Sequence, residues 1–301
     1  MDEFEGKVAV VTGGASGIGA AMAAAFAARG MKLVLADIEP GPLEETAHAL
    51  RGDGADVFAV TADVSRAADV ERVGQAAIDT FGALHVACNN AGVGSGGATW
   101  EVDLSTWEWV LGVNLMGVAH GVRVFTPMML DAAAADPAWR GHIVNTASMA
   151  GLLAPPNMGV YNVSKHAVVA LTETLYQDLS LVTDQVSASV LCPFFVPTGI
   201  SQSHRNRPAE LSDRAARPTR SQLIGQAMSD KAVGSGKVSA ADVAQLVFDA
   251  VAADRFYIYS HPKAIKSVQT RLEDIMQARN PTDPFADKPE LGAELRKALR
   301  A

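Results

Sequence analysis

Lys7-Val-Ala-Val-Val-Thr-Gly-Gly-Ala-Ser-Gly-Ile-Gly19 joins a β-branched run directly to a cluster of glycines. The run from 7 to 12 is short and apolar, which is typical of a strand buried on both faces of a sheet. An alanine-rich stretch from 17 to 29 follows it and ends at Gly30, a common residue at helix C-caps. This part of the chain therefore predicts a strand, a tight turn and a helix in succession.

Strand and helix patterns alternate through most of the remaining chain. Further strands are expected at 32–37, 56–61, 85–89, 142–147, 186–192 and 256–259, and helices at 40–50, 67–81, 104–130, 157–182 and 240–253. Alternation at these lengths is typical of βαβ units. The predicted fold class is α/β, a doubly wound parallel sheet of about seven strands with helices on both faces.

Charge and cysteine content argue against several kinds of partner. The net charge of the 301 residues is −8, and no basic run favours nucleic acid or a membrane surface. No apolar run reaches the roughly 18 residues that span a bilayer, and the acidic N-terminus lacks a signal-peptide pattern. Cys88 and Cys192 lie in apolar runs and indicate a reducing compartment, so the cytoplasm is the expected location. The histidines show no metal-ligand spacing, so no metal is expected.

The glycine turn and an acidic residue after the second strand favour a dinucleotide site. Gly13, Gly17 and Gly19 allow the backbone to approach a pyrophosphate, and free N–H groups at the helix start would face the anion. Asp37 stands 18 residues past Gly19, where a carboxylate can accept both ribose hydroxyls of an adenosine. It would repel a 2′-phosphate, and no basic residue directly follows it, so NAD(H) is expected rather than NADP(H). A solvated acid or a helix N-cap is the alternative interpretation of Asp37.

Tyr161-Asn-Val-Ser-Lys165 brings a tyrosine and a lysine to one face of a helix, roughly 6 Å apart at Cβ. A free phenol has a pKa of about 10, and an ammonium one turn away, together with an oxidised nicotinamide ring, would lower it. The pair could then move a proton on and off an alcohol oxygen. Taken alone, the motif often arises by chance, and an ordinary helix with a surface lysine is the alternative.

The motifs taken together resemble those of the short-chain dehydrogenase/reductase family. In chain order they are TGGASGIG at 12–19, Asp63-Val64, Asn89-Asn-Ala-Gly92, Asn114, Ser148 and Tyr161-x-x-x-Lys165. The likeness runs from residue 7 to about 198 and implies a Rossmann-like fold. It implies a single catalytic domain over 1–261. Within that domain, a polar stretch rich in arginine and proline predicts a mobile substrate lid at about 199–236. The charged helical pattern of 262–301 predicts a helical extension that the likeness does not cover. The likeness also implies a homodimer or homotetramer, in which the helices at 104–130 and 157–182 form the main contact.

The resemblance also implies a role for each matching residue. Tyr161 would be the acid/base, and Ser148 would bind the substrate oxygen. Lys165 would also bind the nicotinamide ribose, while Asn114 would hold a water that relays protons. The residues implied to bind the cofactor are Gly13, Ser16, Gly17, Ile18, Gly19, Asp37, Ile38, Asp63, Val64, Asn90, Ala91, Gly92, Tyr161, Lys165, Val196 and Thr198. Phe194 stands where the family usually has glycine, a departure that puts a bulky ring near the cofactor or the pocket wall.

The expected function is that of an NAD(H)-dependent oxidoreductase that interconverts a secondary alcohol and a ketone. Its expected partners are a small-molecule substrate and further copies of the chain. The predicted pocket walls are apolar and favour a hydrophobic or aromatic substrate; they are Met149, Leu152, Leu153, Pro155, Met158, Phe194 and Phe195. Two alternatives stay open: an NADPH-dependent ketone or 3-oxoacyl thioester reductase, and a non-catalytic dinucleotide-sensing protein. The tail from Pro262 is expected to pack over the pocket mouth or a neighbouring subunit.

Overall fold

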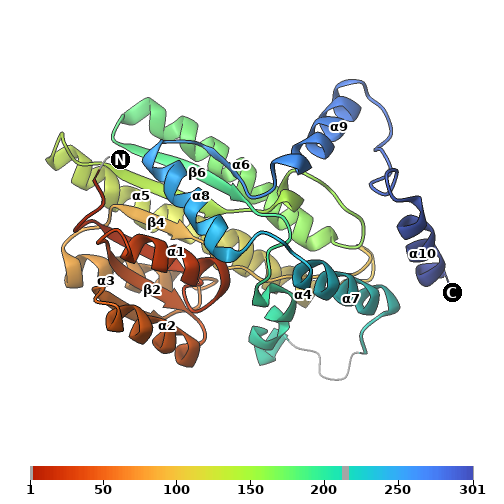
Figure 1. Cartoon of the computed structure of the whole chain (residues 1–301), viewed down its shortest axis with the longest axis horizontal. Helices are drawn as coiled ribbons and strands as arrows, with labels where there is room; N and C mark the ends of the chain where they lie inside the picture. Colours follow the sequence, from red (N-terminus) through yellow and green to blue (C-terminus); the bar gives the residue numbers. More distant parts are fainter. Residues whose placement is uncertain (1–2, 212–216, 301) are drawn as a thin grey trace.

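The computed structural model describes residues 3–211 and 217–300. Within these residues, seven strands form one parallel sheet in the order β3-β2-β1-β4-β5-β6-β7 (Figure 1). They are β1 (Val8–Thr12), β2 (Lys32–Asp37), β3 (Val57–Thr61), β4 (Val86–Asn89), β5 (Gly141–Thr146), β6 (Val186–Cys192) and β7 (Tyr257–Tyr259). The strand order reverses between β1 and β4, and ligands of such sheets bind at the carboxyl ends beside that reversal. The predicted fold class is confirmed.

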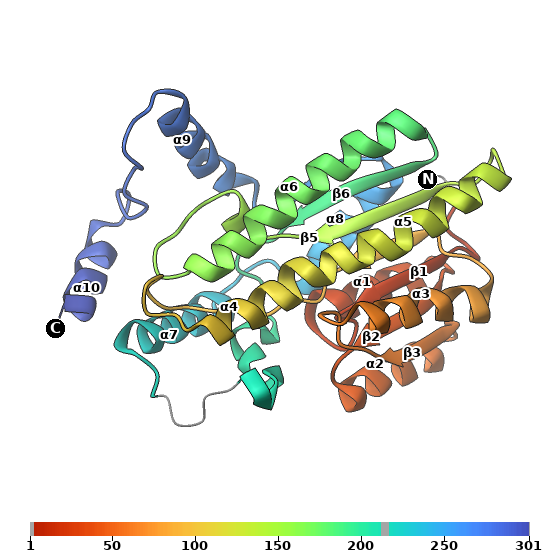
Figure 2. The ribbon, with the colours of Figure 1, turned by 180° about the vertical axis from the view of Figure 1, so that it is seen from behind.

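Helices cover both faces of the sheet, as Figures 1 and 2 show from opposite sides. One face carries α1 (Gly17–Ala27), α2 (Pro40–Gly52) and α8 (Ala240–Ala252), and the other carries α3 (Ala67–Phe81), α5 (Gly117–Ala135) and α6 (Gly159–Val182). Along β1, Ala9 and Val11 pack toward the first face, while Val8 and Val10 pack toward the second. Since side chains alternate across a strand and both faces are covered, the residues from Val8 to Val11 are all apolar, and only the last residue of β1, Thr12, is polar.

A π-helical turn interrupts the helix that the sequence predicts at 104–130. The segment consists of α4 (Leu104–Leu111), the π turn η1 (Gly112–Met116) and α5. Short π turns of this kind insert an extra residue into a helix. Asn114 lies in η1 and is fully buried, so the turn directs a polar side chain into the interior. The sequence predicts the helix but not this interruption.

The lid segment and the C-terminal tail are helical and lie beyond the carboxyl ends of the strands (Figure 1). The lid contains η3 (Gly199–Asn206), η4 (Ala209–Leu211) and α7 (Arg220–Gly234), and its residues 212–216 lie outside the described part of the chain. The tail contains η5 (Pro262–Ala264), α9 (Ile265–Met276) and α10 (Pro289–Arg300). α10 packs against α7. Among the described helices, none is long and apolar enough to cross a membrane.

Candidate active site

The glycine turn after β1 folds tightly on itself. Gly13 has a φ of +67°, and a Cβ atom at that position would lie 2.9 Å from the Cα of Ala91. A Cβ at Gly19 would lie 2.0 Å from the carbonyl oxygen of Gly13, so neither position can carry a side chain without displacing the backbone. Gly19 is buried behind the turn and is not among the residues that line the cavity described below. We expected it to contact the cofactor, and it instead permits the close packing of the turn.

A hydrogen-bonded network behind the turn joins the ends of β1, β4 and β5. The Oγ1 of Thr12 accepts from the backbone N–H groups of Asn90 (2.9 Å) and Ala91 (3.2 Å). The Nδ2 of Asn90 donates to the carbonyl of Thr12 at 3.0 Å, and its Oδ1 accepts from Thr146 Oγ1 at 3.2 Å. Each of these bonds connects two strand ends, so the network holds the central strands together.

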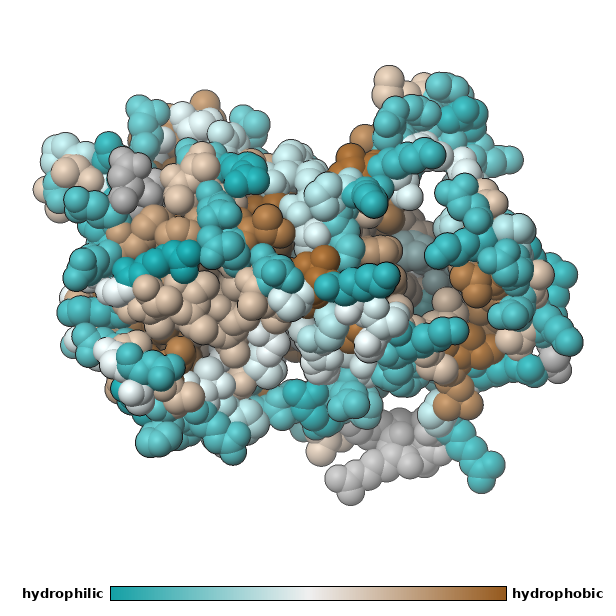
Figure 3. Space-filling model, viewed as in Figure 1, coloured by the Kyte–Doolittle hydropathy of each residue, from teal (hydrophilic) through white to brown (hydrophobic). Residues whose placement is uncertain are grey.

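A cavity of about 1680 Å³ opens at the carboxyl ends of the strands and extends under the C-terminal tail. Figure 3 shows the surface hollowed between the sheet and the tail. The predicted cofactor residues that line the cavity, apart from the Tyr161–Lys165 pair, are Gly13, Ser16, Gly17, Ile18, Asp37, Ile38, Asp63, Val64, Asn90, Ala91, Gly92, Val196 and Thr198. The predicted substrate residues that line it are Leu153, Pro155, Met158, Phe194 and Phe195. Both predicted sites thus share one continuous cavity.

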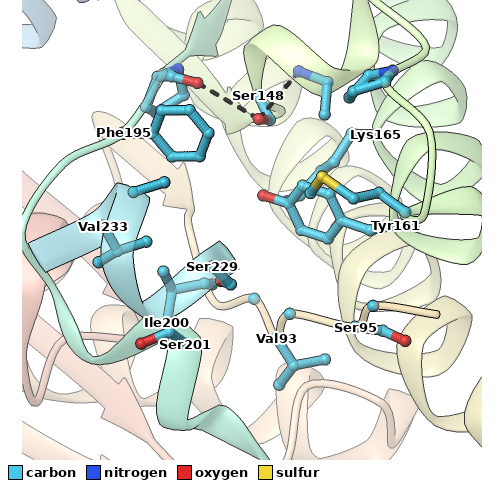
Figure 4. Close-up of a pocket in the computed structure, with 18 of the residues that line it drawn as sticks. Val93, Ser95, Ser148, Tyr161, Lys165, Phe195, Ile200, Ser201, Ser229 and Val233 are labelled. Atoms are coloured by element: carbon cyan, nitrogen blue, oxygen red, sulfur yellow. Dashed lines mark hydrogen bonds between the residues drawn. The ribbon is translucent and has the colours of Figure 1, made fainter. Parts of the chain in front are cut away.

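Ser148, Tyr161 and Lys165 line the same cavity from two neighbouring elements. The first turns of α6 carry Tyr161 and Lys165, and Ser148 follows β5. In Figure 4 the Tyr161 hydroxyl points into the cavity, with Ser148 on one side of it and Phe195 across the opening. The ammonium of Lys165 lies 5.9 Å from the centre of the Tyr161 ring and donates to the carbonyl of Thr146 at 2.9 Å. Lys165 is only 2% exposed, so it is not a surface lysine.

Hydrogen bonds to the backbone hold the Ser148 hydroxyl in place. Its Oγ accepts from the N–H of Ala150 at 3.1 Å and thereby caps the short helix η2 (Met149–Gly151). It also donates to the carbonyl of Pro193 at 3.3 Å. A further hydrogen bond connects it with the phenol of Tyr161. A helix cap therefore fixes a hydroxyl beside the phenol at the cavity wall.

Burial dominates the electrostatics of the tyrosine–lysine pair. It raises the pKa of the Tyr161 phenol, and the hydrogen bond with Ser148 opposes that shift. It also lowers the pKa of the Lys165 ammonium to about 8. We expected Lys165 and an oxidised nicotinamide ring together to lower the phenol pKa. The protein's own groups do not lower it, because desolvation outweighs the hydrogen bond with Ser148. A cationic ligand beside the phenol would favour the phenolate and offset the desolvation.

Asn114 lies behind the cavity wall rather than on it. Its Oδ1 accepts from the N–H of Val93 at 2.8 Å, and its Nδ2 donates to the carbonyl of Val93 at 3.0 Å and to Ser164 Oγ at 3.1 Å. A Cβ atom at Gly92 would lie 3.4 Å from Asn114 Oδ1 and 3.5 Å from Lys165 Nζ. Both polar atoms therefore border one point beside Gly92. A proton relay through a water at this point stays a prediction.

Asp37 supports the glycine turn and lines the cavity. Its Oδ2 accepts from the N–H of Ala15 at 3.0 Å, and its Oδ1 accepts from the N–H of Glu39 at 3.1 Å. Burial raises the pKa of this carboxyl, and the two backbone hydrogen bonds partly oppose the rise. The carboxylate is thus held beside the turn, at the position where an adenosine ribose is expected. Its contact with that ribose stays a prediction.

Two predicted wall residues lie in the core instead. Met149 is 0% exposed and packs with Val168, Val190 and Cys192, and Leu152 packs against the same cluster. Neither residue lines the cavity. The prediction placed them in the pocket because they follow Ser148 in the sequence. It was wrong because the tight turn of η2 directs the Met149 side chain inward.

Phe194 occupies its position without backbone strain. It is not among the described non-glycine residues with a positive φ. Its N–H donates to Ser260 Oγ at 3.0 Å. Its ring lies 4.4 Å from that of Phe195 and 5.7 Å from that of His261, measured between centroids. The substitution for glycine therefore adds an aromatic wall to the cavity rather than distorting the strand end.

The lid and the tail contribute lining residues that the sequence did not predict. From the lid these include Ile200, Arg205, Ser229 and Val233, and from the tail Lys266, Arg271, Leu295 and Leu299. The proline and arginine content of the lid indicated an insert, but no periodicity related either segment to the sheet. The expected position of the tail over the cavity agrees with these contacts.

Comparisons with known proteins agree on one family. The family model described as short chain dehydrogenase matches residues 7–209. A CLA biosynthesis dehydrogenase/reductase from Lactiplantibacillus plantarum is 34% identical over 278 residues, which are 92% of this chain and 95% of that protein. A 1-deoxy-11-beta-hydroxypentalenate dehydrogenase from Streptomyces arenae is 35% identical over 289 residues, 95% of this chain and 93% of that protein. A solved structure, the crystal structure of a short chain dehydrogenase/reductase from Burkholderia phymatum in complex with NAD, has 54% sequence identity with this chain and a TM-score of 0.92. The match covers 95% of this chain and 100% of the chain from Burkholderia phymatum.

Proposed function

Because the chain belongs to the short-chain dehydrogenase/reductase family, we propose that it is an NAD(H)-dependent enzyme that interconverts a secondary alcohol and a ketone. One observation carries the proposal. Ser148, Tyr161 and Lys165 line the same cavity as the glycine turn and Asp37. A proton-transfer group and a dinucleotide site are thereby within reach of one bound substrate.

The residues present fit a dinucleotide. Gly13 and Gly17 have positive φ values of 67° and 56°, and side chains there would fill the turn against which a diphosphate would lie. The carboxylate of Asp37 would accept from the adenosine ribose, and Asp63 would face the adenine. When bound, NAD supplies the acceptor for the hydride that leaves the carbinol carbon.

The protein's own groups would handle the proton and the orientation of the substrate. Tyr161 would take the hydroxyl proton of the alcohol as the ketone forms, and return it in the reverse direction. Ser148 would donate to the same oxygen and hold it beside the phenol. Lys165 would keep a positive charge behind Tyr161, and Asn114 would support exchange of the proton with solvent.

The carboxylate of Asp37 at the end of β2 supports NAD(H) over NADP(H). It lines the adenosine end of the cavity, where it would repel a 2′-phosphate. Glu39 lies beside it, but its carboxylate is paired with Arg205. The related structure from Burkholderia phymatum, which contains NAD, agrees with this preference.

The cavity walls support an apolar substrate. Phe194, Phe195 and Met158 surround the opening beside Tyr161, together with Leu153 and Pro155. Burial of apolar ligand surface against such walls contributes roughly 25 cal/mol per Å². Among the relatives, the pentalenate enzyme is named for a hydroxylated substrate. We therefore propose a hydrophobic or aromatic secondary alcohol.

Association with further copies of the chain is part of the proposal. Met116 on the π turn and Val163 on α6 are 44% and 48% exposed. They belong to the two long helical segments that are expected to form a dimer or tetramer contact. Sedimentation would show an oligomer if these exposed side chains are buried between copies.

A panel of hydrophobic secondary alcohols tests the proposed function. With NAD⁺ present, we expect NADH absorbance to rise for several members of the panel and not for sugars or short hydroxy acids. The variant Tyr161→Phe should still bind NADH but lose about 10² to 10⁴ in turnover, the usual contribution of a positioned acid/base. If Tyr161→Phe retained a tenth or more of wild-type turnover, the role of this phenol would be wrong. Faster reaction with NADP⁺, or none with any substrate, would favour the reductase or the sensor.

A further inference from the structure

Side-chain hydrogen bonds connect the lid to the loop that follows β4 and to the start of α4. Ser203 Oγ accepts from the N–H of Gly94 at 2.8 Å, and Ser221 Oγ accepts from the N–H of Ala98 at 2.8 Å. Arg207 donates to Ser105 Oγ at 2.7 Å. These bonds hold the lid to the part of the chain that follows β4.

One ion pair connects the lid to the opposite side of the cavity. The guanidinium of Arg205, in η3, donates through Nε to Glu39 Oε1 at 3.0 Å and through Nη2 to Glu39 Oε2 at 2.6 Å. Its Nη1 also donates to the carbonyls of Gly199 and Gln202. Hydrogen bonding to Arg205 lowers the pKa of the Glu39 carboxyl. The pair is bidentate and braced on the lid side, which fixes its geometry.

Glu39 lies next to the expected adenosine site, so the ion pair connects the lid to that site. Glu39 follows Asp37 by two residues, and its N–H donates to the Asp37 carboxylate. The same carboxylate accepts from Ala15 in the glycine turn. Glu39, Asp37 and Arg205 all line the cavity. The pair therefore closes the lid across the end of the cavity where the adenosine is expected.

We infer that the Glu39–Arg205 pair is a clasp that holds the lid closed over the adenosine half of the bound dinucleotide and slows its release. The inference rests on the proposed function, since it takes the dinucleotide to lie along the glycine turn and Asp37. In that position the ligand would lie beneath η3. The clasp would have to open before NAD(H) could leave.

An ordinary surface ion pair would behave differently. The side chains of Arg205 and Glu39 are 40% and 23% exposed, and a pair in that range changes an equilibrium by a factor of about five at most. A pair without a role in the lid would leave the rate of cofactor release unchanged. If the pair is a clasp, removing it accelerates cofactor release by that same factor, because the pair must break before the cofactor can leave.

The rate of NADH release tests the clasp. NADH fluorescence in a stopped-flow displacement experiment measures release from the full-length protein. We expect Glu39→Gln and Arg205→Gln each to release NADH up to about fivefold faster than the wild type. The reversed pair, Glu39→Arg with Arg205→Glu, should return the rate toward the wild-type value. Equal release rates in the wild type and both single variants would overturn the inference.

A matched control separates the clasp from a general loss of surface charge. Arg51 pairs with Glu44 at 2.6 Å on α2, away from the cavity, and both side chains are exposed. Arg51→Gln removes the same kind of interaction and should leave NADH release unchanged. If it accelerated release as much as Arg205→Gln does, the clasp would be refuted.

A second measurement does not depend on the cofactor. Hydrogen exchange of the amides in η3, measured without NADH, should be faster in Glu39→Gln and unchanged in Arg51→Gln. Unchanged exchange in Glu39→Gln would show that the pair does not hold the lid. If the wild type bound no NADH, the proposed function would fail, and this exchange measurement would still decide whether the pair secures η3.

Discussion

Replacement of Lys165 by methionine should stabilise the fold while abolishing turnover. The lysine is 2% exposed, and its ammonium donates a hydrogen bond to the carbonyl of Thr146. Burial lowers its pKa from 10.5 to about 8. The folded state therefore holds this charge at an energetic cost that a methionine of similar length would avoid.

The size of the effect follows from the shift in pKa. A difference between 10.5 and about 8 corresponds to about 3 kcal/mol of destabilisation at neutral pH. The variant leaves the Thr146 carbonyl without this donor, which costs about 1 kcal/mol. We therefore expect the free energy of unfolding to rise by about 2 kcal/mol.

The pH dependence has a definite sign. Below a pH of about 8, the lysine is charged in both the folded and the unfolded chain, so the full cost is present. As the pH rises from 8 toward 10.5, the folded state loses the proton first, and the cost fades. The advantage of Lys165→Met should therefore shrink across this window.

Urea denaturation at neutral pH and inside that window measures both quantities. The exposed Lys263 provides a control, because Lys263→Met should change the stability little. A Lys165→Met protein that is less stable than the wild type at neutral pH, or whose advantage is independent of pH, would contradict the reasoning. Turnover should be lost in either case, because the charge behind Tyr161 is gone.

Three other perturbations act at separate places in the chain. Asp37→Ser removes the acceptor for the N–H groups of Ala15 and Glu39, so kcat/KM with NAD⁺ should fall about tenfold or more; an equal loss with NADP⁺ would argue against a role in cofactor choice. Truncation after Ser260 removes α9 and α10 from the cavity and should raise KM for an apolar alcohol severalfold; unchanged KM and assembly would remove the tail from the site. Burial lowers the pKa of His85 to about 4, so stability should fall as the pH drops from 6.5 toward 4, by up to about 3 kcal/mol. The free energy of unfolding of His85→Gln, measured by urea denaturation, should depend less steeply on pH in that window. An unchanged pH dependence would assign the acid sensitivity to other groups.

The fold could be predicted because each buried strand is recognisable in the sequence as a short apolar run. The first four residues of β1, Val8 to Val11, are apolar because their side chains alternate between two covered faces. The turn glycines are also readable, because a Cβ at Gly13 or Gly19 would collide with backbone atoms. These constraints are local, so a pattern of residue types is sufficient to reveal them.

Other features depend on long-range contacts that no pattern contains. The π turn at Asn114 is fixed by hydrogen bonds to Val93, 21 residues earlier in the chain. Arg205 meets Glu39 across 166 residues of sequence, which is why the lid arginines indicated an insert but not its position. Met149 was misplaced for a related reason: proximity to Ser148 in sequence does not determine on which side of the wall a side chain lies.

A crystal structure with NAD⁺ bound would test the central claim most directly. The claim is that one cavity brings the nicotinamide to the Tyr161 hydroxyl. We predict the diphosphate against Gly13 and Gly17, the adenosine ribose on Asp37, and the nicotinamide ring beside Tyr161 and Ser148. A diphosphate bound elsewhere, or a nicotinamide ring turned away from the phenol, would contradict it.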